Sequence, residues 1–419
     1  MATTLESAEG YFKDIFASKL NDVIPDNAKL TKKIKFDTGN KLGEQYSQPV
    51  VLTNEQGVTY ALHSDGVFDL NASINMSTKE AILNAVQFVI RSQMPTNFVT
   101  RAVTAGKQAF GSSIGLVVRN MMNSMTHRLE SSILYGNKGI GKTSTSVNSD
   151  TSTTVVTITA ATWAAGMWAG GETAKINFYN STSQVSSSTD GDFAISAVDI
   201  TDRKLTVTGT ATGIAALDTA AQTSGVALDI YWKGSYGKEM KGIDEIVTNT
   251  GVLFNINAAN YHLWKGNSYA VDGSITFEKI TTSINDAVVK GLNGKVCAYM
   301  SPYTWTKLMQ DLSGDRSYDQ SYSRNKLENG TEQVMLYSQN GVIEIESHNM
   351  VKAGEAFILP IDELSRIGST DITFNNPANG GKFFRELTDK DGFELKAYSE
   401  QSLFCTAPAK MTKLTGITN

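Results

Sequence analysis

The fold is decided by residues 96–135, which read TNFVTRAVTAGKQAFGSSIGLVVRNMMNSMTHRLESSILY. Apolar or small residues recur there every three or four positions, as on one face of an α-helix. They are Val99, Val103, Gly106, Phe110, Ile114, Val117, Met121, Met125, Leu129 and Ile133. Such a helix would extend about 60 Å, close to the diameter of roughly 55 to 60 Å of a compact globule of this chain length. The pattern therefore predicts a spine helix that crosses the whole molecule, weakest at its glycines Gly106, Gly111 and Gly115.

Two shorter elements are predicted before the spine. Residues 77–80, Ser-Thr-Lys-Glu, match a capping box and predict a helix that runs to about Met94 and is ended by Pro95. Residues 41–72 predict a β-hairpin, with strands at 50–53 and 58–62 around the turn-like residues 54–57. A two-stranded hairpin is at best marginally stable alone in water, so this one is expected to lie against another surface.

After Gly136 the composition changes to Ser, Thr, Ala and Gly. Alternating segments at 154–159, 175–179 and 204–208 predict a small all-β insertion domain over residues 144–233. Mixed patterning then returns, with a helix around 277–291, a strand at 296–300, a helix at 303–312 and a strand-rich tail from Gly341. The 419 residues exceed the size of one core, so the chain is predicted to be an α+β protein of several sub-domains.

Residues 1–40 predict an N-terminal arm, made of a short amphipathic segment, Pro25 and a lysine cluster. The cluster comprises Lys29, Lys32, Lys33, Lys35 and Lys41. A solvated arm is the favoured interpretation, and weak contact with nucleic acid is the alternative.

Composition excludes several classes of protein. A net charge of −5 argues against a protein that mainly grips nucleic acid, since such binding needs a basic surface. Apolar runs fall far short of the roughly 20 residues that span a bilayer, and the N-terminus lacks a secretory pattern, so a cytosolic protein without a membrane partner is expected. Cys297 and Cys405 lie in apolar stretches and predict two buried thiols.

One stretch matches the phosphate-binding loop of nucleotide-binding enzymes, namely residues Gly136 to Thr143, GNKGIGKT. That mechanism needs a strand before the loop and a helix after it. Here a long helix is predicted before the loop and a Ser/Thr-rich segment after it. The stretch is therefore interpreted as a connector into the insertion domain, with a P-loop enzyme as an alternative.

Other chemical motifs are weaker still. Residues 111–115 fit the G-x-S-x-G nucleophile pattern, but they fall within the predicted helix rather than at a strand-to-helix elbow. Glu344, Glu346 and His348 would share one strand face, which favours a solvated surface over a metal site. Residues 190–192, Asp-Gly-Asp, favour a turn over a calcium site. The sequence therefore predicts no enzyme, with no catalytic, cofactor-binding or metal-binding residues.

The order of these elements resembles the major capsid proteins of tailed bacteriophages, of the Hong Kong 97 type. The resemblance covers essentially the whole chain and includes several phrases typical of that family. They are AVD at 197–199 leading to LTVTGT at 205–210, GSYGKEMKG at 234–242, SPYTW at 301–305, IEIE at 343–346 with His348, MVKAGEA at 350–356 and PAKMTKLTGI at 408–417.

This resemblance implies an architecture and a set of partners. Residues 1–40 would be an arm, 41–72 an E-loop that reaches over a neighbouring subunit, 73–143 a peripheral domain with the spine helix, 144–233 an outward-facing all-β insertion, 234–360 a mostly axial domain, and 361–419 a return to the peripheral domain. Copies would assemble in the host cytoplasm into the pentamers and hexamers of an icosahedral virion shell around double-stranded DNA. Portal protein, and a separate scaffold or decoration protein, would be further partners. The lysine and asparagine cross-link of some relatives is not predicted, because Lys41 lies only at the base of the loop and neither the asparagine nor an activating glutamate can be matched.

The candidate inter-subunit contacts all lie on the predicted E-loop. They are Lys41, Glu44, Tyr46, Val50, Leu52, Val58, Tyr60 and Leu62. A P-loop enzyme and another self-associating β-rich virion or surface protein remain the alternatives.

Overall fold

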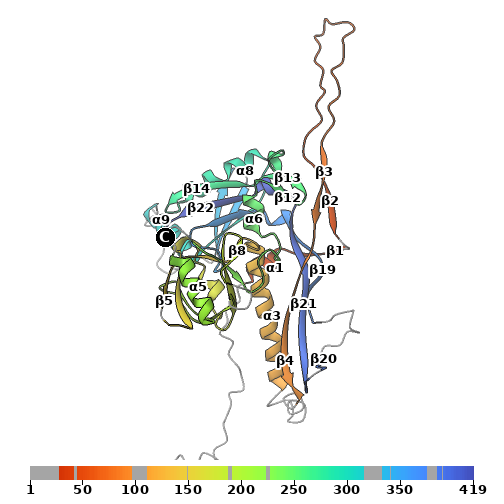
Figure 1. Ribbon diagram of the computed structural model, residues 1–419. Helices are drawn as coiled ribbons and strands as arrows, with labels where there is room; N and C mark the ends of the chain where they lie inside the picture. The colour runs from red at the N-terminus through yellow and green to blue at the C-terminus, as the bar shows by residue number, and fades with distance from the viewer. Residues whose placement is uncertain are drawn as a thin grey trace, which may run out of the picture.

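A computed structural model describes residues 28–41, 45–96, 111–148, 150–186, 191–222, 227–315, 333–339, 341–374, 385–388 and 390–419. Figure 1 shows a broad body of sheets and helices, from which a narrow two-stranded ribbon projects well beyond every other described element. The body holds a five-stranded, a six-stranded and a seven-stranded sheet. The observed class is the α+β class that the sequence predicts.

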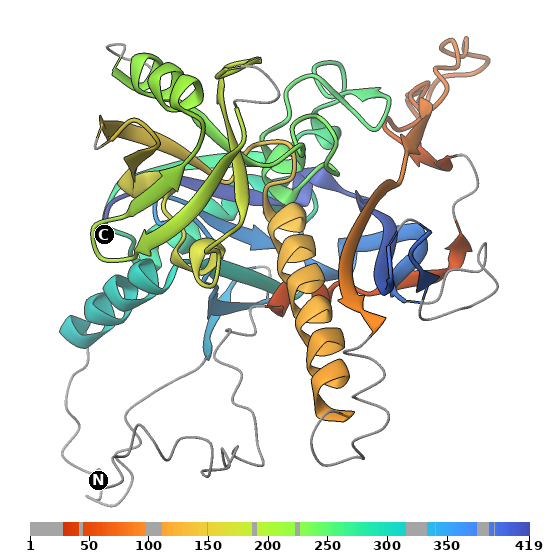
Figure 2. The same ribbon diagram turned by 60° about the horizontal axis from the view of Figure 1, so that its bottom comes forward.

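The five-stranded sheet carries the long helix. It runs in the order β1 (Phe36–Lys41), β19 (Leu364–Thr373), β21 (Gly392–Cys405) and β20 (Arg385–Glu386), with β4 (Val86–Pro95) paired along β21. The helix α3 (Gly111–Leu134) packs Met121 and Met125 against Met94, Leu395 and Ala397 of this sheet. Figure 2 shows α3 lying between this sheet and the seven-stranded sheet.

The helix predicted from Ser77 to Met94 is wrong. These residues form β3 (Thr78–Leu83) and β4, and in β4 partly buried and exposed side chains alternate up to the buried Met94, as in a strand. Phe88, Ile90 and Met94 face α3, whereas Val89 and Arg91 face away from it. β-Branched and aromatic residues at alternate positions outweigh the capping-box signal once a long neighbouring strand, β21, is available for pairing.

The spine helix is confirmed only over its second half. Within it Met121, Met125, Leu129 and Ile133 are buried at the predicted four-residue spacing. Its 24 described residues correspond to about 36 Å of the predicted span. The predicted positions Val99, Val103, Gly106 and Phe110 lie outside the described residues.

The predicted hairpin turn at residues 54–57 is also wrong. Strand β2 (Tyr46–Val51) pairs with β3, so that Tyr46 lies opposite Leu83 and Val51 opposite Thr78. The chain between them runs out and back as one long loop, in which the only further ladder contact described joins Gln56 and Ile74. The projecting element therefore extends to Leu83 rather than to residue 72.

The seven-stranded sheet closes on itself. Its order is β11 (Asp229–Trp232), β5 (Gly141–Asn148), β6 (Thr153–Ile158), β10 (Lys204–Thr208), β9 (Phe193–Asp199), β7 (Lys175–Asn180) and β8 (Ser183–Gln184), and β11 also pairs with β7. This second pairing makes a small barrel, which we call the barrel domain, residues 141–232. Its interior is filled by fully buried side chains that include Val156, Phe178, Phe193 and Leu205.

The prediction that this domain is all β is wrong. Helix α5 (Ala211–Gln222) and the short α4 (Ala165–Trp168) both lie within it. Ile214, Leu217 and Ala221 are buried on one face of α5, at helical spacing. Because the rest of α5 is mostly Ala, Thr and Gly, this period is easily lost in a segment of similar composition.

The six-stranded sheet forms the remaining part of the body. Its order is β14 (Asn267–Gly273), β22 (Thr412–Ile417), β18 (Ala356–Leu359), β15 (Val296–Met300), β17 (Gly341–Ser347) and β16 (Gln333–Ser338). Helices α7 (Phe277–Ser283), α8 (Asn285–Val289) and α9 (Pro302–Asp315) follow the predicted pattern, and β15 coincides with its prediction. The last strand, β22, belongs to this sheet.

Short elements connect these parts. They are α1 (Lys29–Lys33), α6 (Ile243–Thr248), β12 (Val252–Leu253), β13 (Ile256–Asn257) and 3₁₀ turns at Ala160–Thr162, His262–Trp264, Ile361–Glu363 and Pro408–Lys410.

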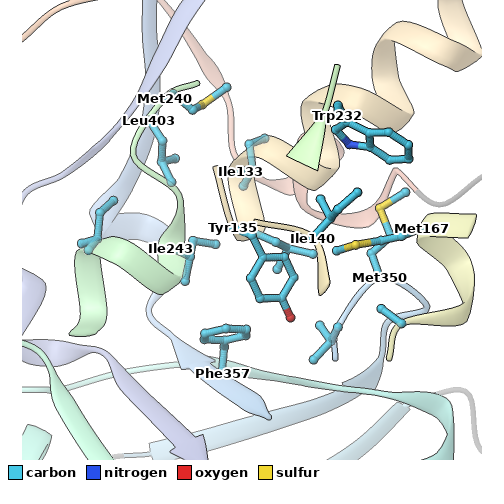
Figure 3. Close-up of a cluster of buried hydrophobic side chains, with 14 of the residues drawn as sticks. Ile133, Tyr135, Ile140, Met167, Trp232, Met240, Ile243, Met350, Phe357 and Leu403 are labelled. Atoms are coloured by element: carbon cyan, nitrogen blue, oxygen red, sulfur yellow. The ribbon is translucent and has the colours of Figure 1, made fainter. Parts of the chain in front are cut away.

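The parts meet at one buried junction. Figure 3 shows Ile133 of the spine, Met167 and Trp232 of the barrel domain, Phe357 of the six-stranded sheet and Leu403 of the five-stranded sheet around Tyr135. All belong to a single hydrophobic cluster. The body is therefore held together by a continuous core, which of residues 52–77 includes only Leu52.

Candidate assembly surfaces

The ribbon, which we define as residues 52–77, exposes apolar side chains along most of its length. Tyr60 is 90% exposed and Leu70 is 79% exposed. The exposed set of the ribbon and its edge comprises Val51, Val58, Tyr60, Leu62, Val67, Phe68, Leu70, Ile74 and Met76. Single exposed apolar residues are ordinary on protein surfaces, but a contiguous group on a projecting element is typical of an interaction site.

Side chains hold the two arms of the ribbon together where the ladder stops. The backbone N–H of Ser77 donates to the Thr53 hydroxyl (2.8 Å), and that of Asn71 donates to the Thr59 hydroxyl (2.8 Å). At the tip the backbone N–H of Leu62 donates to the Asp65 carboxylate (2.7 Å). The ribbon therefore has a defined shape although it has no core of its own.

Gly57 is needed where the two arms approach each other. Its φ of +148° lies in a region that favours glycine, and a Cβ there would lie 3.2 Å from the carbonyl oxygen of Ala72. From Val51 to Gln56 the first arm spans five residues, whereas from Thr78 back to Ile74 the second spans four. The first arm is therefore one residue longer than the second between these two pairs.

The base of the ribbon is anchored in its own subunit. The N–H of Ile82 donates to the carbonyl oxygen of Phe254 (3.0 Å), and the Ser77 hydroxyl contacts the Tyr261 hydroxyl (3.2 Å). The Tyr46 ring meets Phe404 edge-on at 5.7 Å. These contacts fix the direction in which the ribbon projects.

The eight predicted contact residues divide into four groups. Val58, Tyr60 and Leu62 are exposed on the ribbon, as an interface role requires. Leu52 is only 5% exposed and belongs to the subunit's own core, so its prediction as an inter-subunit contact is wrong. Tyr46 and Val50 are partly buried against that core. Of Lys41 only the backbone is described, and Glu44 lies outside the described residues.

The end of the predicted arm is docked rather than solvated. Leu30 and Ile34 are fully buried, and the backbone N–H groups of Leu30 and Thr31 donate to the Glu130 carboxylate on α3 (2.6 and 2.8 Å). Glu130 also accepts a hydrogen bond from the Nε2 atom of His348 (2.8 Å). Burial acts to raise the pKa of Glu130. The hydrogen bonds from His348, Thr31 and Leu30 outweigh burial and hold this pKa below its ordinary value. The ionised carboxylate therefore joins the start of the described chain to the spine and to the six-stranded sheet.

Solved capsid structures have this fold. No protein-family model matches the chain, and no curated protein matches it. A chain of the Cyanophage A-1(L) capsid asymmetric unit matches with a TM-score of 0.53 and 13% identity, over 100% of this chain and 99% of that chain. The capsid of a native GTA particle matches with a TM-score of 0.51 and 8% identity, over 100% and 99% of the two chains. The chain has the tailed-phage major capsid fold.

The capsid fold accounts for the position of the phosphate-loop motif. Residues 136–143 follow helix α3 and lead into strand β5, the reverse of the order that a phosphate-binding loop needs. Lys142 forms an ion pair with Asp229 (3.3 Å), and the Thr143 hydroxyl accepts from the backbone N–H of Leu228 (2.9 Å). In this capsid fold the motif is a connector from the spine into the barrel domain.

The strand face of Glu344, Glu346 and His348 is not a solvated surface, so that prediction is wrong. Glu344 pairs with Lys295 (2.5 Å), Glu346 with Lys33 (2.6 Å), and His348 with Glu130. Within the described ranges no group of His, Cys, Asp and Glu could hold a metal ion. These charges join the docked arm to the six-stranded sheet of the capsid fold.

Two further predictions concern the body of the capsid fold. Cys297 and Cys405 are both buried free thiols, as predicted, and burial raises the pKa of each. None of the described helices combines the length and apolar character that a membrane crossing needs.

Proposed function

We propose that this chain is a major capsid protein, which self-assembles into pentamers and hexamers to form the icosahedral shell around the double-stranded DNA of a tailed phage. The observation that carries the proposal is the ribbon, a fixed projection whose apolar side chains find no cover in their own subunit. Burying one large apolar side chain contributes about 1.5 to 3 kcal/mol. Each contact between neighbouring copies would bury several of these apolar side chains. The stabilisation is repeated at every such contact of a closed lattice.

The charge of the ribbon favours a basic partner surface. Residues 52–77 contain Glu55, Asp65 and Asp69 and no Lys or Arg. A matching surface lies on the five-stranded sheet, on the face opposite α3, where Val89 pairs across the ladder with Tyr398 and Arg91 pairs with Lys396. Arg91 and Lys396 both pair with Glu394 (3.6 and 2.8 Å), so this group keeps one net positive charge beside two apolar side chains. Such a face suits an acidic and apolar ribbon. We therefore assign this face as the surface that a neighbour's ribbon covers.

The remaining parts have roles that follow from the same proposal. The five-stranded sheet with α3 would be the peripheral domain, and the six-stranded sheet would belong to the axial domain near the symmetry axes. The barrel domain would decorate the outer surface. Portal protein, a scaffold or decoration protein, and non-specifically bound DNA would be the other partners, with assembly in the host cytoplasm and no enzymatic step.

Expression of the chain alone tests the proposal. We expect shells, tubes or capsomers by negative-stain microscopy and sedimentation. A variant in which Asn-Gly replaces residues 54–75 should remain folded but unassembled. The replacement joins Thr53 to Met76 by a two-residue turn and keeps the β2–β3 ladder. Removing residues 47–62 instead would delete most of β2 and the buried Leu52, and so would confuse folding with assembly.

Charge reversal tests the assigned surface. Arg91→Glu should weaken assembly, and Asp69→Lys should weaken it similarly, because each places like charges together. The double variant should recover assembly if the two surfaces meet. Normal particles from the ribbon-replaced chain would refute the role of the ribbon, whereas a double variant no better than either single one would refute only the partner surface.

A further inference from the structure

A cavity of about 570 Å³ lies between the barrel domain and the six-stranded sheet. One wall comes from the barrel domain, with Trp163, Ile200 and Arg203. The other comes from the first turns of α9, with Tyr303 and Lys307, and from the end of β22. Figure 1 shows α9 beside the C-terminus on this side of the body. The volume lies within the roughly 300 to 1,000 Å³ that is typical of ligand pockets.

The two walls are fixed to each other by backbone hydrogen bonds. The N–H of Ala353 donates to the carbonyl oxygen of Trp163 (2.9 Å), and the N–H of Gly354 donates to the carbonyl oxygen of Ala161 (2.8 Å). A Cβ at Gly354 would lie 2.8 Å from the Cβ of Ala161, so the two segments are in close contact. The cavity is therefore already formed in the subunit.

Two buried donors on the barrel wall lack an acceptor. Trp163 is 2% exposed, and its Nε1 atom has no hydrogen-bond partner in the described structure. The Nε atom of Arg203 is buried and unpartnered in the same way. A buried N–H that makes no hydrogen bond is costly, most of all on a charged group. Because both side chains line the cavity, an acceptor that enters it can satisfy them.

The turn before β10 holds Arg203 at this wall. Its φ of +56° lies in the left-handed region that side chains other than glycine rarely adopt. The carboxylates of the turn have partners of their own. Asp199 accepts from two backbone N–H groups of the turn (3.0 Å each), and Asp202 pairs with Lys204 (2.7 Å). The turn thus leaves the guanidinium of Arg203 to the cavity.

The lining suits a ligand with an anionic end and an apolar body. Arg203 and Lys307 supply positive charge from the two walls, whereas Ile200 and Tyr303 are exposed apolar side chains. Tyr303 lies in the first turn of α9, where the helix dipole favours negative charge. A carboxylate has two oxygens for the two buried donors. A phosphate would bring further oxygens against apolar walls, where polar atoms without partners are costly.

We propose that this cavity binds a small organic acid, whose carboxylate accepts hydrogen bonds from Trp163 Nε1 and Arg203 Nε and whose apolar body lies against Ile200 and Tyr303. The bound acid contacts both walls and so joins the barrel domain to α9. Because only the folded chain has the cavity, binding stabilises the folded subunit. This inference does not depend on assembly.

Equilibrium dialysis of the full-length chain with two matched probes tests the proposal. 4-Phenylbutyrate should bind at one site per chain with a dissociation constant below about 1 mM, as expected for a ligand of this size. 4-Phenylbutan-1-ol has the same apolar body without the charge. It should bind at least about tenfold more weakly, because it cannot form charge-assisted hydrogen bonds with a carboxylate. Equal binding of the two probes would overturn the proposal.

Four variants separate the charge from the apolar wall. Arg203→Gln should weaken the binding of 4-phenylbutyrate about tenfold and leave that of the alcohol unchanged. Trp163→Phe, which keeps a ring but removes Nε1, should also weaken the acid alone. Tyr303→Ser should weaken both probes alike, because each loses an apolar contact. Lys175→Gln, at an exposed position elsewhere on the barrel domain, should change neither. An equal loss from Lys175→Gln and Arg203→Gln would overturn the proposal, because the attraction would then come from net charge alone.

A peptide probe distinguishes a free acid from a protein segment. Acetyl-Gly-Phe-Asp-Gly-amide carries a carboxylate beside an aromatic ring, but on a peptide backbone. It should bind more weakly than 4-phenylbutyrate, because the donors lie on buried side chains that a slender ligand reaches more easily. Binding of the peptide without binding of 4-phenylbutyrate would assign the cavity to a partner protein and would overturn the assignment to a small acid.

Discussion

The ribbon and the barrel domain both extend from the body of the subunit, but the barrel domain buries its large apolar side chains whereas the ribbon exposes them. The barrel domain closes its sheet by pairing β11 with both β5 and β7, and it buries Phe178, Phe193 and Leu205 completely. The ribbon has two arms and no second layer, so Tyr60, Leu62 and Leu70 stay exposed.

The difference teaches which part needs a neighbour. Closure removes sheet edges and gives the barrel domain its own core, so its stability is internal. The ribbon can bury its apolar side chains only on another surface. Stability of the subunit and assembly of the shell should therefore respond to mutations in different regions.

The largest expected effect is on assembly. Replacing Tyr60, Leu62, Val67, Phe68 and Leu70 together by Ser should raise the protein concentration needed for assembly at least about 100-fold, since each lost apolar contact weakens it. The melting temperature of the unassembled subunit should hardly change. Sedimentation and thermal unfolding measure the two quantities.

A control variant on the body makes this comparison sharper. Val252, Val289 and Met335 are also exposed apolar residues, but they lie on the body. Their replacement by Ser should disturb assembly much less than the ribbon variant does. An equal loss from both variants would mean that exposed apolar area in general, rather than the ribbon, drives assembly.

The barrel domain should give the opposite result. Phe193 is fully buried and meets Phe178 edge-on at 5.3 Å, so Phe193→Ala should lower the free energy of unfolding by about 3 to 5 kcal/mol. Denaturant unfolding measures this loss. The fraction that remains folded should still assemble, and a stable Phe193→Ala subunit that fails to assemble would contradict the division of roles.

Elements with a strong local period could be predicted from the sequence. Strands β6, β7, β10 and β15 and the second half of the spine follow from alternation or from four-residue spacing. The ribbon register could not be predicted, because β2 pairs with β3 across a long loop and the turn-like residues 54–57 suggest an earlier return. Strand β4 was not predicted, because its partner strand β21 lies some 300 residues later in the sequence and only this pairing makes the alternation of β4 decisive.

The candidate site was predictable in part for the same reason. Val58, Tyr60 and Leu62 were identified on the outgoing arm, whereas Val67, Phe68 and Leu70 were missed. A usable signal did exist, since apolar residues continue to Met76 without any Lys or Arg. The Glu130 and His348 pair could not be found in this way, because 218 residues separate them and only the fold brings them together.

Two leucines test the comparison within the ribbon itself. Leu52 is 5% exposed and Leu62 is 74% exposed. Leu52→Ala should cost about 2 to 5 kcal/mol of subunit stability, whereas Leu62→Ala should change it by less than about 0.5 kcal/mol. In assembly assays at equal concentrations of folded protein, Leu62→Ala should have the larger effect and Leu52→Ala the smaller one. Equal stability of the two variants would place Leu52 outside the core.

The smallest effect concerns the docked arm and depends on pH. Glu130→Gln removes the charge that accepts from His348, Thr31 and Leu30, and should cost about 2 kcal/mol at neutral pH. A carboxyl whose pKa is lower in the folded state contributes stability above its unfolded pKa and loses it as the pH falls through the folded pKa. Because the pKa of Glu130 lies below its ordinary value of 4.5, the wild-type protein should lose its advantage over Glu130→Gln as the pH falls below about 4.5. Urea unfolding of both proteins in the ribbon-replaced, unassembled background measures the difference. A stability difference between the two proteins that stays constant or grows as the pH falls would show that an ionised Glu130 does not hold the arm.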